Sequence, residues 1–295
     1  MKDIWEETAL RANRVVAQPI ELSSEYPASQ CFKNLQLADI PGVMDQKGFR
    51  IGSALMRRWF SSPSFTMPSG WKRTDATDFD HRSISPQYID QTTVTMAWAL
   101  RFGRTQEVVD ELRRVIAGQL SPRSHQISKD RLAGRLKRAG KLGAQAAPFG
   151  NSQSAVDLHE TAHVNSRNVG TNSIEKLTDP IDDMYCALGA FTLHASAEGV
   201  VTPLRGMLGT PSHRVEIHSL NFYLRDSYDF SGDQILGNWN NGDVRTFPTS
   251  NLYMVENASF RRWRDVHRKG GDFLIFSDVY KEKLSAPMTW DVQAF

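Results

Sequence analysis

The sequence predicts an α+β protein in which a mostly helical N-terminal half precedes an antiparallel, β-rich and half-barrel-like C-terminal half. Up to about residue 145, apolar side chains recur at the spacing of amphipathic helices. From about residue 180, apolar and polar side chains alternate as in half-buried strands. We expect four parts: an N-terminal arm (1–40), a helical region (41–145), a linker or loop region (146–179) and a β-rich candidate catalytic domain (180–295).

The composition limits the classes of protein to which the chain can belong. With 295 residues, 40% of them hydrophobic, the chain can bury a full core in one large domain or two of ordinary size. The net charge of +2 gives no reason to expect a nucleic-acid partner, and two cysteines are too few for a disulfide framework. The sequence contains no run of about 18 apolar residues, so we expect no membrane-spanning helix. Residues 1–13 are acidic where a secretory signal would be apolar, so we expect synthesis in the cytoplasm and export, if any, by another route.

In the helical region, two segments have the clearest helical periodicity. Residues 51–60 carry apolar side chains at helical spacing, and a Ser-Ser-Pro sequence follows as a stop. Residues 105–117 place their apolar side chains on one face, with Thr105 as the N-cap and a glycine after the last turn. Residues 93–102 fit either a strand or a buried helix, and the Pro-rich residues 61–91 predict a long ordered loop.

Residues 119–142 form a strongly basic segment with a thin apolar stripe. Its one acid is Asp130, and its cations are Arg123, Lys129, Arg131, Arg135, Lys137, Arg138 and Lys141. A basic amphipathic helix of this kind fits an anionic membrane surface. The alternative is a solvated helix whose charge is balanced by acids elsewhere, since the whole chain is nearly neutral.

The C-terminal half predicts strands joined by turns, and one short helix. Residues 185–201 resemble a β-hairpin with its turn near Glu198 and Gly199. The other elements expected here are a helix over 260–268 with Ser259 as its cap and Gly270-Gly271 as its end, and strands over 215–226, 272–276 and 289–295.

The first candidate site lies where the strand over residues 215–226 runs into a loop. The polar side chains at this point are Arg225, Asp226, Tyr228 and Asp229. Two carboxylates and a phenol at a strand end can bind a metal, act as acid and base, or orient a phosphate. The basic helix that follows would add an anion site if it packs back on the sheet. Alternatively, the aspartates form a turn and the basic side chains face solvent.

The second candidate site is the sequence His159-Glu160-Thr161-Ala162-His163, which has the HExxH spacing of zinc peptidases. On a helix, His159 and His163 would share one face and hold Zn²⁺, while Glu160 would activate its water. Thr161 stands where such helices usually have a large apolar residue, and the chain turns polar soon after His163. We therefore expect both histidines to be largely solvent-facing or in an irregular loop, with no common metal ion.

Several segments resemble an uncharacterised bacterial family that is associated with type VI secretion and polymorphic toxins. They are IPGVMDQKGFRIGSALMRRWF, TVTMAWALRFGR, DDMYCALGAFTL, LRDSYDFSGDQILGNWN and VENASFRRWRDVHRKGGDFLIFSD. The β-rich half also resembles the catalytic domain of colicin M, through LGAFTLHASAEGVV, the Asp-x-Tyr-Asp-Phe sequence after the strand, and GGDFLIF.

The colicin M resemblance implies a phosphodiesterase that cuts lipid II, the lipid-linked peptidoglycan precursor, in the periplasm. Residues 226–229 match the Asp-x-Tyr-Asp motif of that family. Where colicin M has a His-Arg pair shortly after this motif, the chain has Ile235-Leu236, so His267 and Arg268 would have to replace the pair in space. The resemblance also implies Mg²⁺, with Asp229 as a ligand.

Three functions follow from these features. The first is an antibacterial type VI effector, a toxin that hydrolyses lipid II or a related phosphate ester and whose partners are a cognate immunity protein and a secretion spike or adaptor. The second is a zinc metallopeptidase that uses the HExxH sequence, and the third is a non-enzymatic adaptor that docks an effector on the spike. For the first function, the catalytic residues would be Asp226, Tyr228, Asp229 and His267, and the substrate-binding residues would be Arg225, Arg264 and Arg268.

Overall fold

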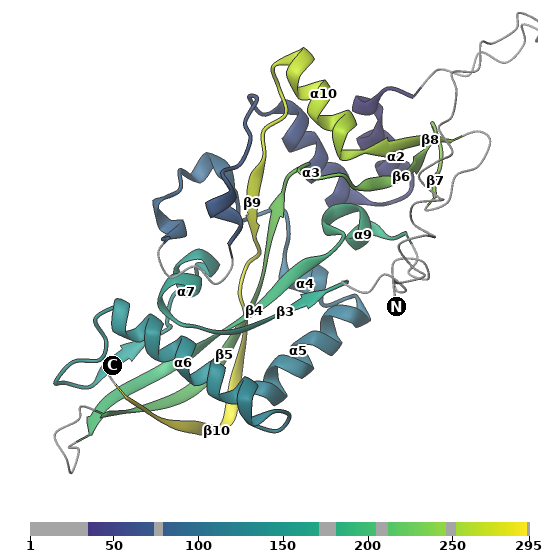
Figure 1. Cartoon of the computed structure of the whole chain (residues 1–295). Helices are drawn as coiled ribbons and strands as arrows, with labels where there is room; N and C mark the ends of the chain where they lie inside the picture. Colours follow the sequence, from purple (N-terminus) through teal and green to yellow (C-terminus); the bar gives the residue numbers. More distant parts are fainter. Residues whose placement is uncertain (1–34, 74–78, 171–180, 205–211, 246–251, 294–295) are drawn as a thin grey trace, which may run out of the picture. The chain divides into compact units, whose positions relative to one another are not determined.

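A curled sheet of seven strands runs through the molecule, and helices pack against it (Figure 1). The structure is a computed structural model that describes residues 35–73, 79–170, 181–204, 212–245 and 252–293. Residues Leu35–Phe295 form one compact unit. The predicted α+β class is confirmed, with helices predominant in the N-terminal half and a half-barrel-like sheet built mainly from the C-terminal half.

The helices and strands have the following bounds. The helices are α2 (Ile40–Gln46), α3 (Arg50–Ser61), α4 (Met96–Ala99), α5 (Gly103–Ile116), α6 (Pro122–Arg138), α7 (Ala155–Thr161), α9 (Asp183–Leu188) and α10 (Asn257–His267). Short 3₁₀ turns are η1 (Leu37–Asp39), η2 (Ser69–Lys72), η3 (His81–Ser83) and η4 (Pro86–Tyr88). The strands are β1 (Ile89–Asp90), β2 (Ala147–Phe149), β3 (His163–Val169), β4 (Phe191–Leu204), β5 (Ser212–Tyr228), β6 (Ile235–Trp239), β7 (Val244–Arg245), β8 (Tyr253–Glu256), β9 (Phe273–Phe276) and β10 (Tyr280–Gln293).

Two long neighbouring strands form the centre of the sheet. β4 and β5 pair antiparallel from Thr192↔Arg225 to Leu204↔Ser212. β2 and β3 pair with the other edge of β4, whereas β9 and β10 pair with the other edge of β5. β1 comes from the N-terminal half and pairs parallel to β9. β7, β6 and β8 form a separate antiparallel sheet.

The predicted hairpin over residues 185–201 is wrong. The chain instead forms helix α9, capped by the side chain of Asp182, and then the single continuous strand β4. Glu198 and Gly199 mark a register shift in the pairing of β4 with β5, and not a turn. A Cβ atom at residue 199 would lie 1.8 Å from the carbonyl oxygen of Glu216, so glycine is required where the two strands approach at this bulge.

The predicted linker over residues 146–179 is also wrong in its described part, because this part contains β2, α7 and β3. Leu158 and Val164 in this part are fully buried in the core. Ser154 begins α7 by accepting a hydrogen bond from the N–H of Asp157. Elements this short contain too few residues to show a clear periodicity, and their burial comes from neighbours distant in sequence.

The N-terminal half follows the predicted pattern more closely. α3 and α5 span nearly the expected residues, α6 confirms a helix in the basic segment, and residues 93–102 contain the short helix α4. Two caps differ from the prediction: Thr105 lies inside α5, and Ser259 lies inside α10, whose cap position is Glu256. Most of the predicted arm, residues 1–34, lies outside the described residues.

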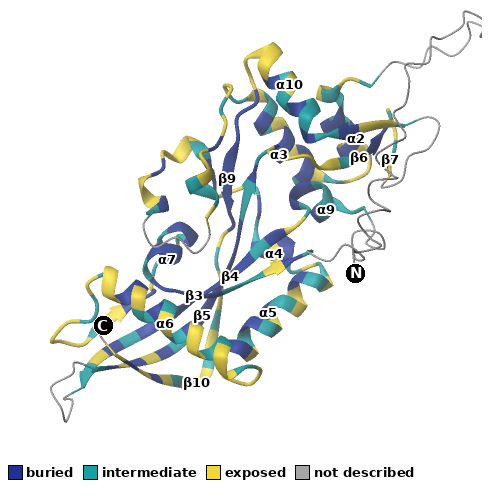
Figure 2. Ribbon diagram, viewed as in Figure 1, coloured by how far each residue is buried: buried dark blue, intermediate teal, exposed yellow. Residues whose placement is uncertain are grey.

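Burial follows the layering of the sheet and helices. Figure 2 shows that the central strands are buried along much of their length, whereas α5, α6 and α10 each expose one side. α5 and α6 pack on β3, and α7 contacts η3, α6 and β4. None of the described helices is long and apolar enough to cross a lipid bilayer.

Candidate functional site

The alternation of side chains along β5 divides the first candidate site between the two faces of the sheet. Successive side chains of a strand point to opposite faces, so Asp226 and Tyr228 lie on one face and Arg225 on the other. Arg225 is buried and donates hydrogen bonds to the backbone carbonyl of Trp71 and to His81. Among the residues predicted for one site, the fold therefore separates Arg225 from the carboxylates.

A cavity of about 340 Å³ lies at the end of β5. Asp226, Tyr228 and Asp229 form part of its wall. Much of the remaining wall is apolar and comes from α2, α3, α9, β6 and α10, with Ile40, Met44, Met56, Leu188, Leu236 and Phe260 among its residues. The cavity thus combines carboxyl and other polar groups with apolar side chains, as is usual for small-molecule sites.

Asp229 is paired with a lysine that the sequence gave no reason to expect. Lys72, at the end of η2, places its Nζ 2.7 Å from Oδ1 of Asp229 and 2.9 Å from the hydroxyl of Ser231. The same carboxylate oxygen accepts a hydrogen bond from the N–H of Ser231 at 3.0 Å. Only 9% of the Asp229 side chain is exposed, so this ion pair is largely shielded from water.

Asp226, in contrast to Asp229, is protonated and therefore uncharged at neutral pH. Burial raises the pKa of Asp226 to about 8, against the opposing effect of a hydrogen bond from the Ser227 N–H. The negative charge of Asp229 adds to this increase. At neutral pH the cavity therefore contains one protonated carboxyl group, Asp226, beside one carboxylate that is paired with a lysine.

Tyr228 is part of the wall but is also packed into the core. Its ring is stacked on Phe273 at 5.0 Å between centroids and makes an edge contact with Phe230. Burial raises the pKa of Tyr228 well above its usual value, so the phenol is neutral in the cavity wall.

The predicted basic residues of α10 contact other groups. Arg264 forms a buried ion pair with Asp272 and a hydrogen bond with Thr66. His267 is exposed, and its ring is stacked on Trp263 at 4.3 Å between centroids. Arg268 ends α10 in the left-handed conformation with φ of 53°. Among the described residues, none of the hydrogen bonds and ion pairs of these side chains reaches Asp226 or Asp229.

The opposite face of β5 carries a buried cluster of histidines, which we call the histidine cluster and which comprises His81, His159, Glu160, His163 and His194. Each of these side chains is at most 5% exposed. Nδ1 of His81 lies 2.8 Å from Oε1 of Glu160, and Nε2 of His163 lies 3.2 Å from Nδ1 of His194. The cluster joins η3, α7, β3 and β4 on one face of the sheet.

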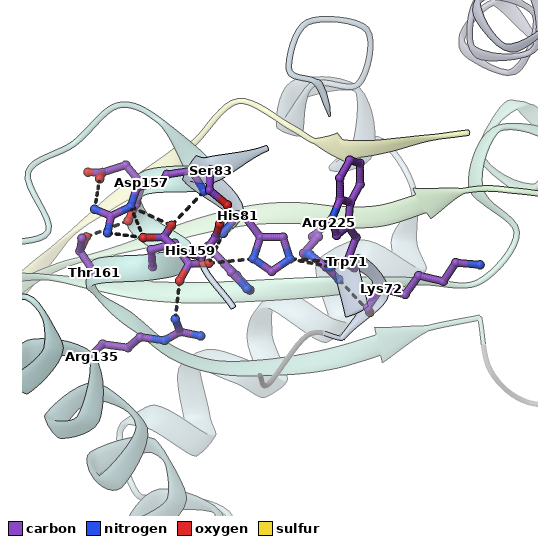
Figure 3. Close-up of polar contacts among 12 residues, drawn as sticks. Trp71, Lys72, His81, Ser83, Arg135, Asp157, His159, Thr161 and Arg225 are labelled. Atoms are coloured by element: carbon purple, nitrogen blue, oxygen red, sulfur yellow. Dashed lines mark hydrogen bonds and ion pairs between the residues drawn. The ribbon is translucent and has the colours of Figure 1, made fainter. Parts of the chain in front are cut away.

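Groups around the histidine cluster hold its members in place, and Figure 3 shows part of this network, around His81, His159, Arg135 and Arg225. Arg135 on α6 donates from Nη1 to Oε2 of Glu160 at 2.8 Å. Tyr223 on β5 places its hydroxyl 3.0 Å from Nδ1 of His159. Burial lowers the pKa values of His159, His163 and His194 well below their usual range, so these three imidazoles are neutral at pH 7.

The prediction that His159 and His163 face solvent or an irregular loop is wrong, because both are buried in regular elements. α7 ends at Thr161 and His163 begins β3, so the two histidines do not occupy successive turns of one helix. His163 contacts His194 instead, and Glu160 is bonded to Arg135 and His81. The helical zinc-peptidase arrangement is therefore not formed.

A different set of side chains is arranged for metal binding. His81, His159 and Glu160 each offer one ligand atom, and these atoms lie within 4.8 Å of one another. Sequence reasoning missed His81 because it is separated from Glu160 by 79 positions and lies in a predicted loop. No local periodicity relates two residues that far apart.

The carboxylates of the cavity fit Mg²⁺ poorly. Mg²⁺ prefers ionised carboxylates and water in octahedral coordination. Asp226 is protonated at neutral pH, and the ammonium group of Lys72 already contacts Oδ1 of Asp229. The cation beside Asp229 is therefore Lys72, and the cation in the cavity wall itself is Arg104.

Comparison with known proteins adds a family but no activity. A family model described as "Family of unknown function (DUF6402)" matches residues 35–253 and 246–292 of the chain. No curated protein and no solved structure shows significant similarity to the chain.

Proposed function

We propose that this chain, which belongs to the DUF6402 family of unknown function, is a hydrolase of a phosphate ester or anhydride linked to an apolar group. The observation that supports the proposal is the pair of carboxyl groups at the cavity in different protonation states. Asp226 is an acid with a pKa of about 8, and Asp229 is a carboxylate paired with Lys72. Environments that keep one carboxyl group protonated and a neighbouring one ionised are typical of acid–base catalysis.

Each of the three residues has a role in the proposed reaction. Asp229 accepts a proton from a water molecule as its oxygen attacks phosphorus. The bond from phosphorus to the leaving oxygen breaks, and Asp226 gives its proton to that oxygen. Lys72 stabilises the negative charge on the phosphoryl oxygens, which in phosphoryl transfer is the main contribution that a protein can make.

The substrate class follows from the walls of the cavity. Apolar side chains such as Met44, Leu188 and Phe260 suit the hydrocarbon part of a lipid-linked phosphate better than a sugar or a nucleotide. The lipid-linked peptidoglycan precursor, which the resemblance to colicin M implies, has this chemistry. As the biological setting, we propose an antibacterial effector that is secreted by the type VI route. It would act in the periplasm of a target cell and be neutralised by a cognate immunity protein.

Release of the phosphate-bearing sugar fragment from lipid II, and of inorganic phosphate or pyrophosphate from a shorter polyprenyl pyrophosphate, tests the activity. We expect the wild-type chain to hydrolyse at least one of them, and Asp226→Asn or Asp229→Asn to reduce the rate by about 100-fold or more, as for loss of a general acid or base. Asp233→Asn is the matched control, because Asp233 is 96% exposed and absent from the cavity wall, and it should retain the wild-type rate. No release by the wild-type chain, or unchanged release by both cavity variants, would refute the proposal.

The setting is tested separately, by expressing the chain with a periplasmic export signal in a sensitive bacterium. We expect lysis with the wild-type chain and survival with Asp229→Ala. Equal survival with both would contradict the effector role and favour the alternative of an adaptor.

A further inference from the structure

We propose that His81, His159 and Glu160 form a binding site for one divalent transition-metal ion of the zinc type. The site lies on the face of β5 opposite the cavity and is independent of the proposed hydrolase reaction. Two imidazoles and one carboxylate are a donor set that zinc favours, whereas Mg²⁺ and Ca²⁺ prefer oxygen ligands.

The first argument is that His81, His159 and Glu160 each bring one potential ligand atom close to the other two. Nδ1 of His81 and Oε1 of Glu160 lie 2.8 Å apart, and Nε2 of His159 is buried with no hydrogen-bond partner among the described residues. A buried polar atom without a partner costs free energy, and a metal ion would satisfy it. Ligand atoms of a tetrahedral zinc site lie about 3.3 Å apart, so binding would separate the pair now at 2.8 Å slightly and bring together any pair near the upper limit of 4.8 Å.

The second argument is that the other polar atom of each ligand is already held by a neighbour. Nδ1 of His159 contacts the hydroxyl of Tyr223, and Oε2 of Glu160 accepts a hydrogen bond from Arg135. Nε2 of His81 lies 3.2 Å from the carbonyl oxygen of Trp71. Metal-bound imidazoles and carboxylates usually have such outer partners, which fix the ring orientation and the tautomer.

Protons balance in this scheme without any net release. In the metal-free chain, His81 donates from Nδ1 to Glu160. When a metal ion occupies Nδ1, the proton moves to Nε2 and is donated to the carbonyl of Trp71, which requires Arg225 to give up the hydrogen bond that it donates to Nε2 in the metal-free chain. His159 needs no proton transfer, because Nε2 carries the lone pair when Nδ1–H donates to the hydroxyl oxygen of Tyr223.

The buried position determines how the ion enters and how strongly it binds. His81, His159 and Glu160 are at most 5% exposed, so we expect the ion to be incorporated as the chain folds. Arg135 and Arg225 lie beside the ligands, and their positive charges repel a bound metal ion. Affinity should therefore be lower than in a site surrounded by acids, and the ion should stabilise the fold more than it serves catalysis.

Zinc content after refolding tests the site. The full-length chain would be refolded with Zn²⁺ alone, separated from free metal by gel filtration, and analysed for metal and for its Tm with and without a chelator. We expect about one zinc ion per wild-type chain and a lower Tm when the chelator removes it. His159→Gln should lose the bound zinc, and Tyr223→Phe should weaken zinc binding by about 10-fold, because Tyr223 orients a ligand.

His213→Gln is the matched control, because His213 is a buried histidine on β5 that is bonded to the carbonyl of Gly143, outside the histidine cluster. It should keep the wild-type zinc content. If His159→Gln does not fold, His81→Gln replaces it. A wild-type chain that retains no zinc, or a folded His159→Gln chain with undiminished zinc, would overturn the proposal.

Discussion

The two faces of β5 place polar side chains in different surroundings, a cavity on one face and a closed core on the other. On one face, Asp226 and the nearby Asp229 line a cavity that can admit a ligand. On the other face, Tyr223 and Arg225 are sealed under η3 and α7, among imidazoles and one glutamate. The exposure of a polar group and the partners around it, more than its residue type, therefore decide what chemistry it can perform.

Charge is balanced differently on the two faces. At the cavity, the carboxyl group of Asp226 avoids the cost of a buried charge by remaining protonated. In the histidine cluster, Glu160 is paired with Arg135, and the exposed fractions of the two side chains are 2% and 5%. A buried pair of this kind costs desolvation free energy, and removal of one partner leaves the other uncompensated.

The largest expected effect concerns that buried pair. Glu160→Ala leaves Arg135 without its buried counter-charge and should lower the free energy of unfolding by about 3–5 kcal/mol. Urea denaturation with a chelator present measures this. Asp80→Ala is the control, because Asp80 is 45% exposed in its pair with Arg82 and should change the free energy by about 1 kcal/mol or less. Equal losses for the two variants would show that the two faces do not differ as described.

The pH dependence of stability should report the cavity face. The pKa of Asp226 is about 8 in the folded chain and about 4 when unfolded, so the folded state binds the extra proton between these values. Stability from this group is full below pH 4 and falls as pH rises towards 8, by up to about 1.4 kcal/mol per pH unit. Denaturation midpoints from pH 5 to 9 should therefore fall less steeply in Asp226→Asn. An identical slope in both chains would contradict the protonated state of Asp226.

Tyr223 and Tyr228 lie on opposite faces of β5, so removing each hydroxyl compares its contribution to stability on the two faces. The hydroxyl of Tyr223 is bonded to His159, so Tyr223→Phe should lower the free energy of unfolding by about 1 kcal/mol. The hydroxyl of Tyr228 has no hydrogen-bond partner among the described residues, so Tyr228→Phe should change stability by less than about 0.5 kcal/mol. The measurement is urea denaturation in the presence of a chelator, and the reverse order would contradict a stabilising hydrogen bond between Tyr223 and His159.

The smallest expected effect is on the outer side of α6. Lys137 is exposed, two positions after the buried Arg135, and Lys137→Ala should change stability by less than about 0.5 kcal/mol. The same variant tests whether this helix contacts an anionic membrane surface, as we propose from its charge. We expect weaker co-sedimentation with anionic vesicles, and weaker binding of the wild-type chain at high salt. Binding that ignores both charge and salt would exclude this contact.

Local sequence patterns determined the parts of the fold that depend on neighbouring residues. α3, α5 and the helix of the basic segment follow from apolar spacing, and β5 and β9 follow from alternation and apolar content. The placement of Asp226 and Asp229 together at a strand end also follows from the sequence, and the structure puts both at one cavity. The alternation of β5 already contained the signal that separates Arg225 from Asp226, because adjacent side chains of a strand point to opposite faces.

Only the tertiary structure decided which distant residues meet. Lys72 reaches Asp229 across 157 positions, and His81 reaches Glu160 across 79. No short-range pattern encodes such pairs, since they depend on how the loop before β1 lies over the finished sheet. The same holds for the burial of α7 and for the bulge at Gly199, where the neighbouring elements determined the outcome. Periodicity specifies which side of an element is apolar, but the charge state of a buried side chain depends on what packs against it.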